Sequence, residues 1–308
     1  MSASFSRRAA LRGLGALGLG AALPATAASM PTPVRRDHHT LTAHTFSVGD
    51  ANVTVIRDTG FQLPLGAIGV NVDSSRVLAT LREYGLPTDN VPVDVNQLVI
   101  DHGDVRTLID TGTGQGHLVS TMGALGMDPG SVDRVVVSHH HGDHIGGLSM
   151  DGTPTFPNAS VHIGATELAF LDGYTGENEQ VTAALTKLAP VRDRLQTYRS
   201  GDTLMPGLTA MAAFGHTPGH MAFQLASGDG KLMIVSDAVA HPVVFFRHPT
   251  WLFGFDMDGA TTVNTRRRLL SQAAREGTTL FASHMPFPGT GRVSVDGAGF
   301  RYTPFPMG

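Results

Sequence analysis

The chain contains no cysteine and has few aromatic or charged residues. Of its 308 residues, 6% are aromatic and 16% are charged, and the formal net charge is −4. The lack of thiols excludes disulfides and a cysteine nucleophile, so a bound metal must have nitrogen and oxygen ligands. Because no run of basic residues is longer than three, a nucleic acid is not an expected partner.

The N-terminal apolar run, Gly13–Leu23, is shorter than the roughly 20 residues that a membrane-spanning helix needs. Arg7 and Arg8 precede this run, and Ala25-Thr26-Ala27 follows it. This order is typical of a cleaved secretory signal, and the arginine pair resembles the twin-arginine export type. We expect a periplasmic or secreted protein without a membrane anchor; a chance arginine pair in a disordered N-terminus is the alternative. The expected parts are a signal peptide (residues 1–27), a polar lead (28–40) and one folded domain (41–308).

Short apolar runs alternate with helical patterns along the rest of the chain. The predicted strands cover residues 46–48, 53–56, 96–100, 105–109, 134–137, 160–163, 208–213, 231–235 and 279–282. The predicted helices cover residues 74–84, 116–125, 166–171, 181–188 and 260–276, and Gly277 is a stop signal for the last one. This interleaving predicts an α/β protein with mixed sheets.

The stretch VVVSHHHGDHIGGL, residues 135–148, places possible metal ligands directly after a predicted strand. Open α/β sheets bind their ligands at the carboxyl ends of strands. In a tight turn His139 and His141 can point one way, while Asp143 and His144 point another, so one loop can serve two metal centres. His140 falls between these positions, and we interpret it as a structural or solvent-facing residue.

Three further strands also end next to possible ligands. Residues 208–214 lead into GHTPGH, which contains His216 and His220. Two later strands lead into Asp237 and His284. This repetition predicts that the strand ends assemble one site.

The motif HxHxDH followed by these residues resembles the metallo-β-lactamase-fold hydrolases over about residues 41–308. The resemblance implies a four-layer αβ/βα sandwich, with metals at one edge of two mixed sheets. It assigns His139, His141 and His216 to one divalent ion. It assigns Asp143, His144 and His284 to a second, with Asp237 bridging both. Zinc suits these ligands, and manganese, cobalt and iron are alternatives.

Two residues are expected to support the ligands. Asp110 matches a family position that stabilises the site through hydrogen bonds, an arrangement that fixes the orientation of a ligand histidine. Its alternative role is to cap a turn. In GHTPGH the family ligand is the first histidine, so His220 is interpreted as a supporting or structural residue.

Two metal ions would lower the pKa of a shared water and supply a bridging hydroxide as nucleophile. The sequence contains no GxSxG motif, which favours this mechanism over a serine nucleophile. We expect Asp143 or Asp237 to pass a proton to the leaving oxygen.

Differences between this sequence and related enzymes of the fold narrow the expected substrate class. Asp237 is a bridging carboxylate that true β-lactamases of this fold lack. The 24 residues after His284 leave no room for the helical domain of glyoxalase II. Three stretches resemble the methyl-parathion-hydrolase-like branch, which includes acyl-homoserine lactonases: residues 236–242, the helix 260–276 and residues 283–289. Ala240 stands where some other lactonases use a tyrosine to bind the carbonyl.

An aromatic cluster follows Asp237 in the sequence. Its members are Phe245, Phe246, Trp251, Phe253 and Phe255. We predict that it forms a hydrophobic wall of the substrate pocket, with Phe287 as a further member. The alternative is that these rings belong to the core or to a dimer interface, and the resemblance also allows a homodimer.

Three functional hypotheses follow. The first is an exported dinuclear hydrolase that opens lactones or cleaves carboxylic esters of small molecules with a hydrophobic part. The second keeps the same site and makes phosphotriesters the main substrate. The third is a metal-binding protein without turnover.

Overall fold

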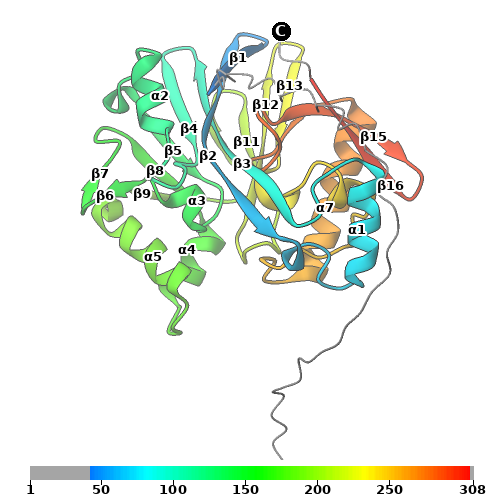
Figure 1. The fold of residues 1–308 in the computed structure, drawn as a ribbon. Helices are drawn as coiled ribbons and strands as arrows, with labels where there is room; N and C mark the ends of the chain where they lie inside the picture. The colour runs from blue at the N-terminus through cyan, green and yellow to red at the C-terminus, as the bar shows by residue number, and fades with distance from the viewer. Residues whose placement is uncertain (1–41, 306–308) are drawn as a thin grey trace, which may run out of the picture. The chain divides into compact units, whose positions relative to one another are not determined.

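The computed structural model of the protein describes residues 42–305, and two seven-stranded mixed sheets form its centre (Figure 1). The first sheet has the order β1 (Ala43–Val48), β2 (Ala51–Pro64), β3 (Asn90–His102), β4 (Val105–Ile109), β5 (Arg134–Val137), β8 (Ser160–Gly164) and β9 (Leu195–Tyr198). The second has the order β10 (Thr203–Met205), β11 (Leu208–Ala212), β12 (Met221–Ser227), β13 (Gly230–Ile234), β14 (Thr279–Phe281), β15 (Thr290–Asp296) and β16 (Gly299–Pro304). A small hairpin joins β6 (Ser149–Met150) to β7 (Thr153–Pro154).

Helices cover the outer face of each sheet. The first sheet packs against α2 (Leu118–Ala124), α3 (Gly142–Ile145), α4 (Ala165–Asp172) and α5 (Glu179–Leu188). The second packs against α1 (Ser74–Glu83), α6 (Val244–Arg247) and α7 (Gly259–Glu276). A third apolar cluster fills the space between the sheets. The predicted four-layer αβ/βα sandwich is therefore confirmed.

The valines of β5 show how the sequence produces these layers. Successive side chains of a strand point to opposite faces. Val136 therefore joins the core between the sheets, while Val135 and Val137 pack on the helix side. Because both faces are covered, the strand is apolar throughout, as buried parallel strands are.

Helix α7 begins and ends where its sequence predicts. The side chain of Asp258 accepts a hydrogen bond from the Thr261 amide at the N-terminus, and Gly277 adopts φ 62° after the last turn. These are the usual cap residues at the two ends of a helix. The buried face contains Leu269, Leu270 and Ala273, and also the charged residue Arg266.

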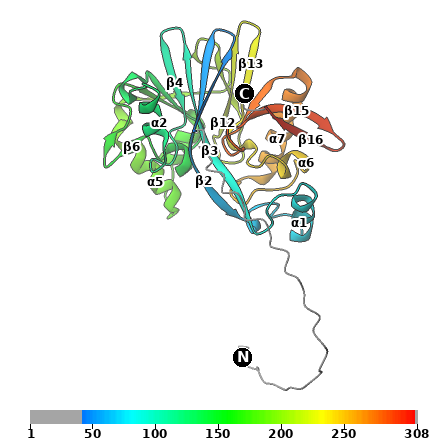
Figure 2. The same cartoon turned by 45° about the horizontal axis from the view of Figure 1, so that its top comes forward.

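Strands β2 and β3 are longer than predicted. Their paired segments 57–64 and 90–96, which we call the arm, continue past the sheet towards α1 (Figures 1 and 2). The register shifts between Arg57 and Thr59, which indicates a bulge at Asp58. Gly60 and the mixed burial of the arm break the apolar pattern, so the sequence predicted one strand that ends at Ile56 and another that begins at Asn96.

The N-terminal predictions concern residues outside the described range. Within residues 42–305, none of the helices has the length and apolar character needed to cross a membrane.

Candidate metal centre

All seven predicted ligands lie at one edge of the two sheets. His139 and His141 follow β5, and Asp143 and His144 lie on the short helix α3. The other three follow strands of the second sheet. His216 comes after β11, Asp237 lies in a 3₁₀ turn after β13, and His284 comes after β14.

The ligand atoms form three overlapping groups, within each of which they lie no more than 4.8 Å apart. The groups are His139, His141 and His216; His139, His144 and Asp237; and Asp143, His144 and His284. The first and third have the membership that the family resemblance implied. Asp237 lies between them, because its carboxylate is 3.4 Å from Nε2 of His216 and 3.1 Å from Nε2 of His284.

The donor set fits metal ions. Nε2 of His139 and Nε2 of His144 are buried and make no hydrogen bond among the described residues. Nδ1 of His141 is 2.9 Å from Nε2 of His216, so both nitrogens point into the same space. Buried polar atoms normally have a partner, and converging imidazole nitrogens beside carboxylates are the ligands expected for zinc and similar metals.

The electrostatics of the ligand side chains also favour a cation. Burial raises the pKa of Asp143, but the charges of His144 and His284 outweigh it and hold that pKa below its usual range. Burial lowers the pKa of His284, yet Asp237 and Asp143 raise it to about 10. The site therefore attracts positive charge, which a metal supplies while displacing protons.

Asp110, at the end of β4, holds the motif loop together. One carboxylate oxygen accepts a hydrogen bond from Nδ1 of His144 at 2.8 Å and another from Oγ of Ser138 at 2.7 Å. Oγ of Ser138 also lies 3.0 Å from Nδ1 of His139. Asp110 and Ser236 have φ of 60° and 44°, backbone conformations that cost about 1–3 kcal/mol each and cluster at functional sites.

His220 lies behind the ligands. Its Nδ1 donates to the carbonyl of Ala213 at 2.8 Å, and its Nε2 accepts from the backbone amide of Asp237 at 3.2 Å. Burial, helped by the charge of His216, lowers its pKa to about 4. A neutral His220 therefore holds the backbone of Asp237.

His140 is buried, and its partner is a residue that the sequence analysis did not identify. Glu167 of α4 is fully buried and accepts hydrogen bonds from Nδ1 and from the backbone amide of His140. Its other oxygen accepts from Oγ1 of Thr217 and the amide of Gly219, at 2.9 and 2.8 Å. One carboxylate thus joins the two loops that carry the first ligand group. Of the two interpretations of His140, the structural one agrees with these contacts, and the solvent-facing one was wrong.

Strand β3 supports the other side of the site. The carbonyl of Asp94 accepts from Nδ1 of His284 at 2.8 Å. The side-chain amide of Asn96 donates to the carbonyls of Ser283 and Met285, at 3.0 and 2.8 Å. No local sequence pattern marks these residues, because their hydrogen-bond partners are almost 190 positions away in the sequence.

A pocket of about 520 Å³ opens onto the ligands. His141, Asp143, His216, Asp237 and His284 line its floor. Its apolar walls are Phe61, Leu63 and Val93 from the arm, Ala183 from α5, and Phe253 and Phe255. The predicted contribution of Phe253 and Phe255 agrees with this lining, whereas the arm residues were not predicted.

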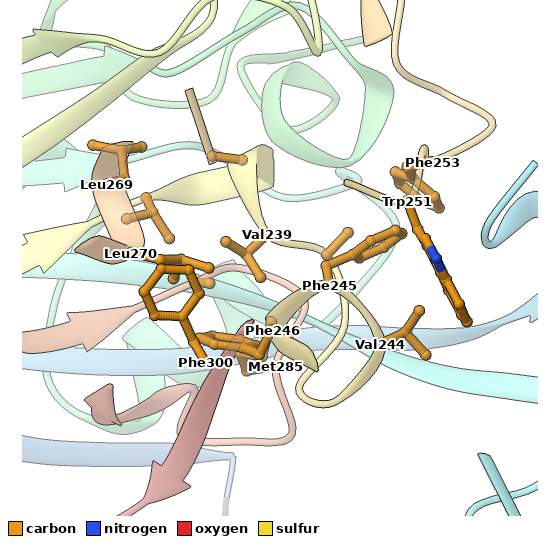
Figure 3. Packing of buried hydrophobic residues seen from close by; sticks show 14 of the residues in the cluster. Val239, Val244, Phe245, Phe246, Trp251, Phe253, Leu269, Leu270, Met285 and Phe300 are labelled. Atoms are coloured by element: carbon orange, nitrogen blue, oxygen red, sulfur yellow. The ribbon is translucent and has the colours of Figure 1, made fainter. Parts of the chain in front are cut away.

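The other predicted pocket residues were wrong. Phe245, Phe246 and Trp251 lie in the core between the second sheet and its helices (Figure 3). Phe287 packs against the core between the sheets and is not among the pocket residues. Hydrophobicity alone does not distinguish a core ring from a pocket ring, and the α6 turn directs Phe245 and Phe246 inwards, where both are 0% exposed.

Comparison with known proteins agrees with this geometry. The family model of the metallo-beta-lactamase superfamily matches residues 90–284. An N-acyl homoserine lactonase AttM from Azorhizobium caulinodans is 29% identical over 179 residues, which cover 54% of this chain and 64% of that protein. The AttM lactonase of Agrobacterium fabrum is 26% identical over 178 residues with the same coverage. The chain thus spans a little under two thirds of each relative.

Two solved structures resemble the fold over most of its length. The dizinc quorum-quenching lactonase AidC, in complex with a product, superposes with a TM-score of 0.82 and 25% identity over 86% of this chain and 98% of that one. The hydrolase AbOPH of the beta-lactamase superfamily superposes with a TM-score of 0.81 and 26% identity, over 87% and 98%. With its ligand groups at the sheet edge and a family match over most of its length, the chain belongs to the metallo-beta-lactamase superfamily.

Proposed function

We propose that the protein is a dinuclear hydrolase that opens lactones and cleaves carboxylic esters carrying an apolar acyl chain. The observation that carries this proposal is the apolar pocket directly above Asp143 and Asp237. A carbonyl placed between the ligand groups would leave its acyl chain against Phe61 and Phe253. The lactonases AttM and AidC among the similar proteins support this substrate class.

The two ligand groups would each hold one divalent ion, with Asp237 shared between them. Zinc fits the donors best, and manganese, cobalt and iron are alternatives. When bound, two such ions polarise a carbonyl and lower the pKa of water towards neutrality.

Asp143 is the carboxylate best placed to move a proton. Its side chain is 22% exposed and lines the pocket, whereas that of Asp237 is 4% exposed and is enclosed by histidines. Water adds to the ester carbonyl and the acyl C–O bond breaks. Asp143 takes the proton of the attacking water and returns it to the released alcohol oxygen. Asp237 instead fixes the imidazoles on both sides of it.

Purified protein tests this proposal directly. We expect a higher kcat/KM for acyl-homoserine lactones and aryl esters than for an aryl phosphotriester, with kcat/KM rising with acyl length until the pocket is filled. A higher value for the phosphotriester would make organophosphate hydrolysis the main activity. Two bound metal equivalents without any hydrolysis would instead indicate a metal-binding protein.

We also propose that the protein is exported through its N-terminal arginine pair. The support is the order of arginines, apolar run and small residues in the sequence. Changing both Arg7 and Arg8 to lysine should retain the protein in the cytoplasm, as cell fractionation would show. Export that continues in the double variant would refute the twin-arginine assignment. A homodimer stays a prediction, which sedimentation analysis checks.

A further inference from the structure

Helix α7 buries one charged side chain, that of Arg266, which is 1% exposed. Its Nε donates to the carbonyl of Ala238 at 2.8 Å, and its Nη1 donates to the carbonyl of Trp251 at 2.7 Å. Its guanidinium carbon lies 4.4 Å from the centre of the Phe245 ring, which is a cation–π contact. The ring of Phe245 therefore covers one side of a buried cation.

The charge of Arg266 faces a second buried residue. Nη2 lies 3.5 Å from Oδ2 of Asp256, whose side chain is also 1% exposed. Burial lowers the pKa of Arg266, and the negative charge of Asp256 opposes that shift. A buried charge is tolerated only when it is paired and hydrogen-bonded, and each of these two residues meets that need for the other.

Asp256 connects the pair to the metal site. Its Oδ1 lies 3.1 Å from Nδ1 of His216, and its Oδ2 accepts from the backbone amide of Phe253 at 3.0 Å. The ring of Phe253 stacks on that of His216 at an angle of 13°. One carboxylate therefore holds a ligand histidine and a wall of the substrate pocket.

The contacts of Arg266 reach a second ligand. Ala238, whose carbonyl accepts from Arg266, directly follows Asp237. His216 and Asp237 come from different strands, β11 and β13. Through Asp256 and Ala238, a single buried arginine thus connects two ligand segments without touching either ligand.

We propose that Asp256 and Arg266 form a positioning unit that sets His216 and Asp237 in the geometry needed for metal binding. This inference rests on the proposed metal-dependent function. Asp256 accepts a hydrogen bond from Nδ1 of His216 and so leaves Nε2 free to bind metal. Arg266 holds the Asp256 carboxylate in place and anchors the segment after Asp237.

Zinc affinity tests the proposal without relying on turnover. Zinc would be titrated into each metal-free variant in competition with a chromophoric chelator. We expect Asp256→Asn, which keeps the shape of the side chain, to weaken one of the two zinc equivalents about 10–100-fold. Arg266→Met should weaken zinc binding as well, and Arg266→Lys should give an intermediate loss, because lysine keeps the charge but lacks the planar fork. Arg267→Met is the matched control, because Arg267 is the exposed neighbour on the same helix.

The tautomer of His216 provides a second readout. Nitrogen NMR of metal-free protein should show His216 protonated at Nδ1, with a mixture of tautomers in Asp256→Asn. A purely structural pair would lower thermal stability and leave this spectrum unchanged. If Arg266→Met does not fold, the Asp256→Asn result decides the question.

Failure of this inference differs from failure of the proposed function. If Asp256→Asn binds both zinc ions as tightly as wild type and keeps the same tautomer of His216, the positioning role is wrong. That conclusion holds even if the wild type is an active lactonase. A wild type without hydrolytic activity whose zinc affinity still falls in Asp256→Asn overturns only the proposed reaction.

Discussion

The two ligand groups are supported by different parts of the molecule. His139, His141 and His216 depend on buried charged side chains, because Glu167 joins their loops and a second carboxylate holds His216. In the group of Asp143, His144 and His284, the buried carboxylate of Asp110 holds His144, while β3 contacts the segments around Asp143 and His284 through a backbone carbonyl and side-chain amides. One sheet edge can therefore hold one ligand group through buried charges and the other partly through an extended strand.

We expect the largest effect at Asp237, because this residue lies between the two ligand groups and serves both. Asp237→Asn should lower kcat/KM for a lactone by about 1000-fold, the order seen when a group that stabilises the transition state is removed. It should also weaken both metal equivalents. Steady-state kinetics and metal analysis would measure these losses. Asp229→Asn, on the exposed turn after β12, is the control, and loss of one metal alone would contradict a shared role.

Glu167 tests whether the first group depends on a buried charge. Burial raises the pKa of Glu167, but hydrogen bonds from His140 and Thr217 hold it below its usual value. Glu167→Gln should cost about 3–5 kcal/mol in the free energy of unfolding, because it breaks a buried charged network. Urea denaturation would measure this cost, with exposed Glu177→Gln as control. Unchanged stability would show that the charge is dispensable.

His241 offers a way to measure the acid sensitivity of the fold separately from loss of metal. Its Nδ1 accepts from the amides of Val243 and Val244, and burial lowers its pKa to about 4. The unfolded chain binds a proton on His241 near pH 6.5, whereas the folded chain does not. Neutral His241 therefore contributes fully to the free energy of unfolding above pH 6.5. This contribution is lost as the pH falls towards 4, and the loss amounts to about 3 kcal/mol.

The variant His241→Asn keeps an acceptor for these amides and removes the titration. Metal-free His241→Asn should therefore lose less stability than metal-free wild type between pH 7 and pH 4, as denaturant unfolding at each pH would show. Equal losses in the two proteins would assign the acid sensitivity to other groups.

Asn96 tests the support of the second group. Asn96→Ala removes two hydrogen bonds to the segment around His284 and should cost about 2 kcal/mol in the free energy of unfolding. Metal competition should show a weaker second site and an unchanged first site, whereas we expect Glu167→Gln to weaken the first site alone. Asn158→Ala, which removes an exposed side-chain hydrogen bond, is the control. If both variants weaken the same metal, the two groups are not supported separately.

The sequence predicted the layers of the fold and the convergence of ligands, because both follow from local patterns. The valines of β5 alternate between two cores, and ligand-type residues directly follow strands that end at one edge. Among the supporting residues, Asp110 and His220 were predicted from the family resemblance. Glu167 and Asn96 could not be predicted, because they are single polar residues whose partners lie far away in the sequence. Phe245 and Phe61 show the same limit for apolar residues, since only the fold decides which ring faces the core and which faces the pocket.

The arm has a consequence for how the substrate range can change. Its residues Phe61 and Val93 form a pocket wall, while Asp94, next to Val93 on the same strand, holds His284. A shift of the arm backbone that admits a bulkier substrate would therefore also displace a ligand histidine. We expect broader specificity to arise through smaller side chains at Phe61 on an unmoved backbone, which makes this wall adaptable in composition and rigid in position.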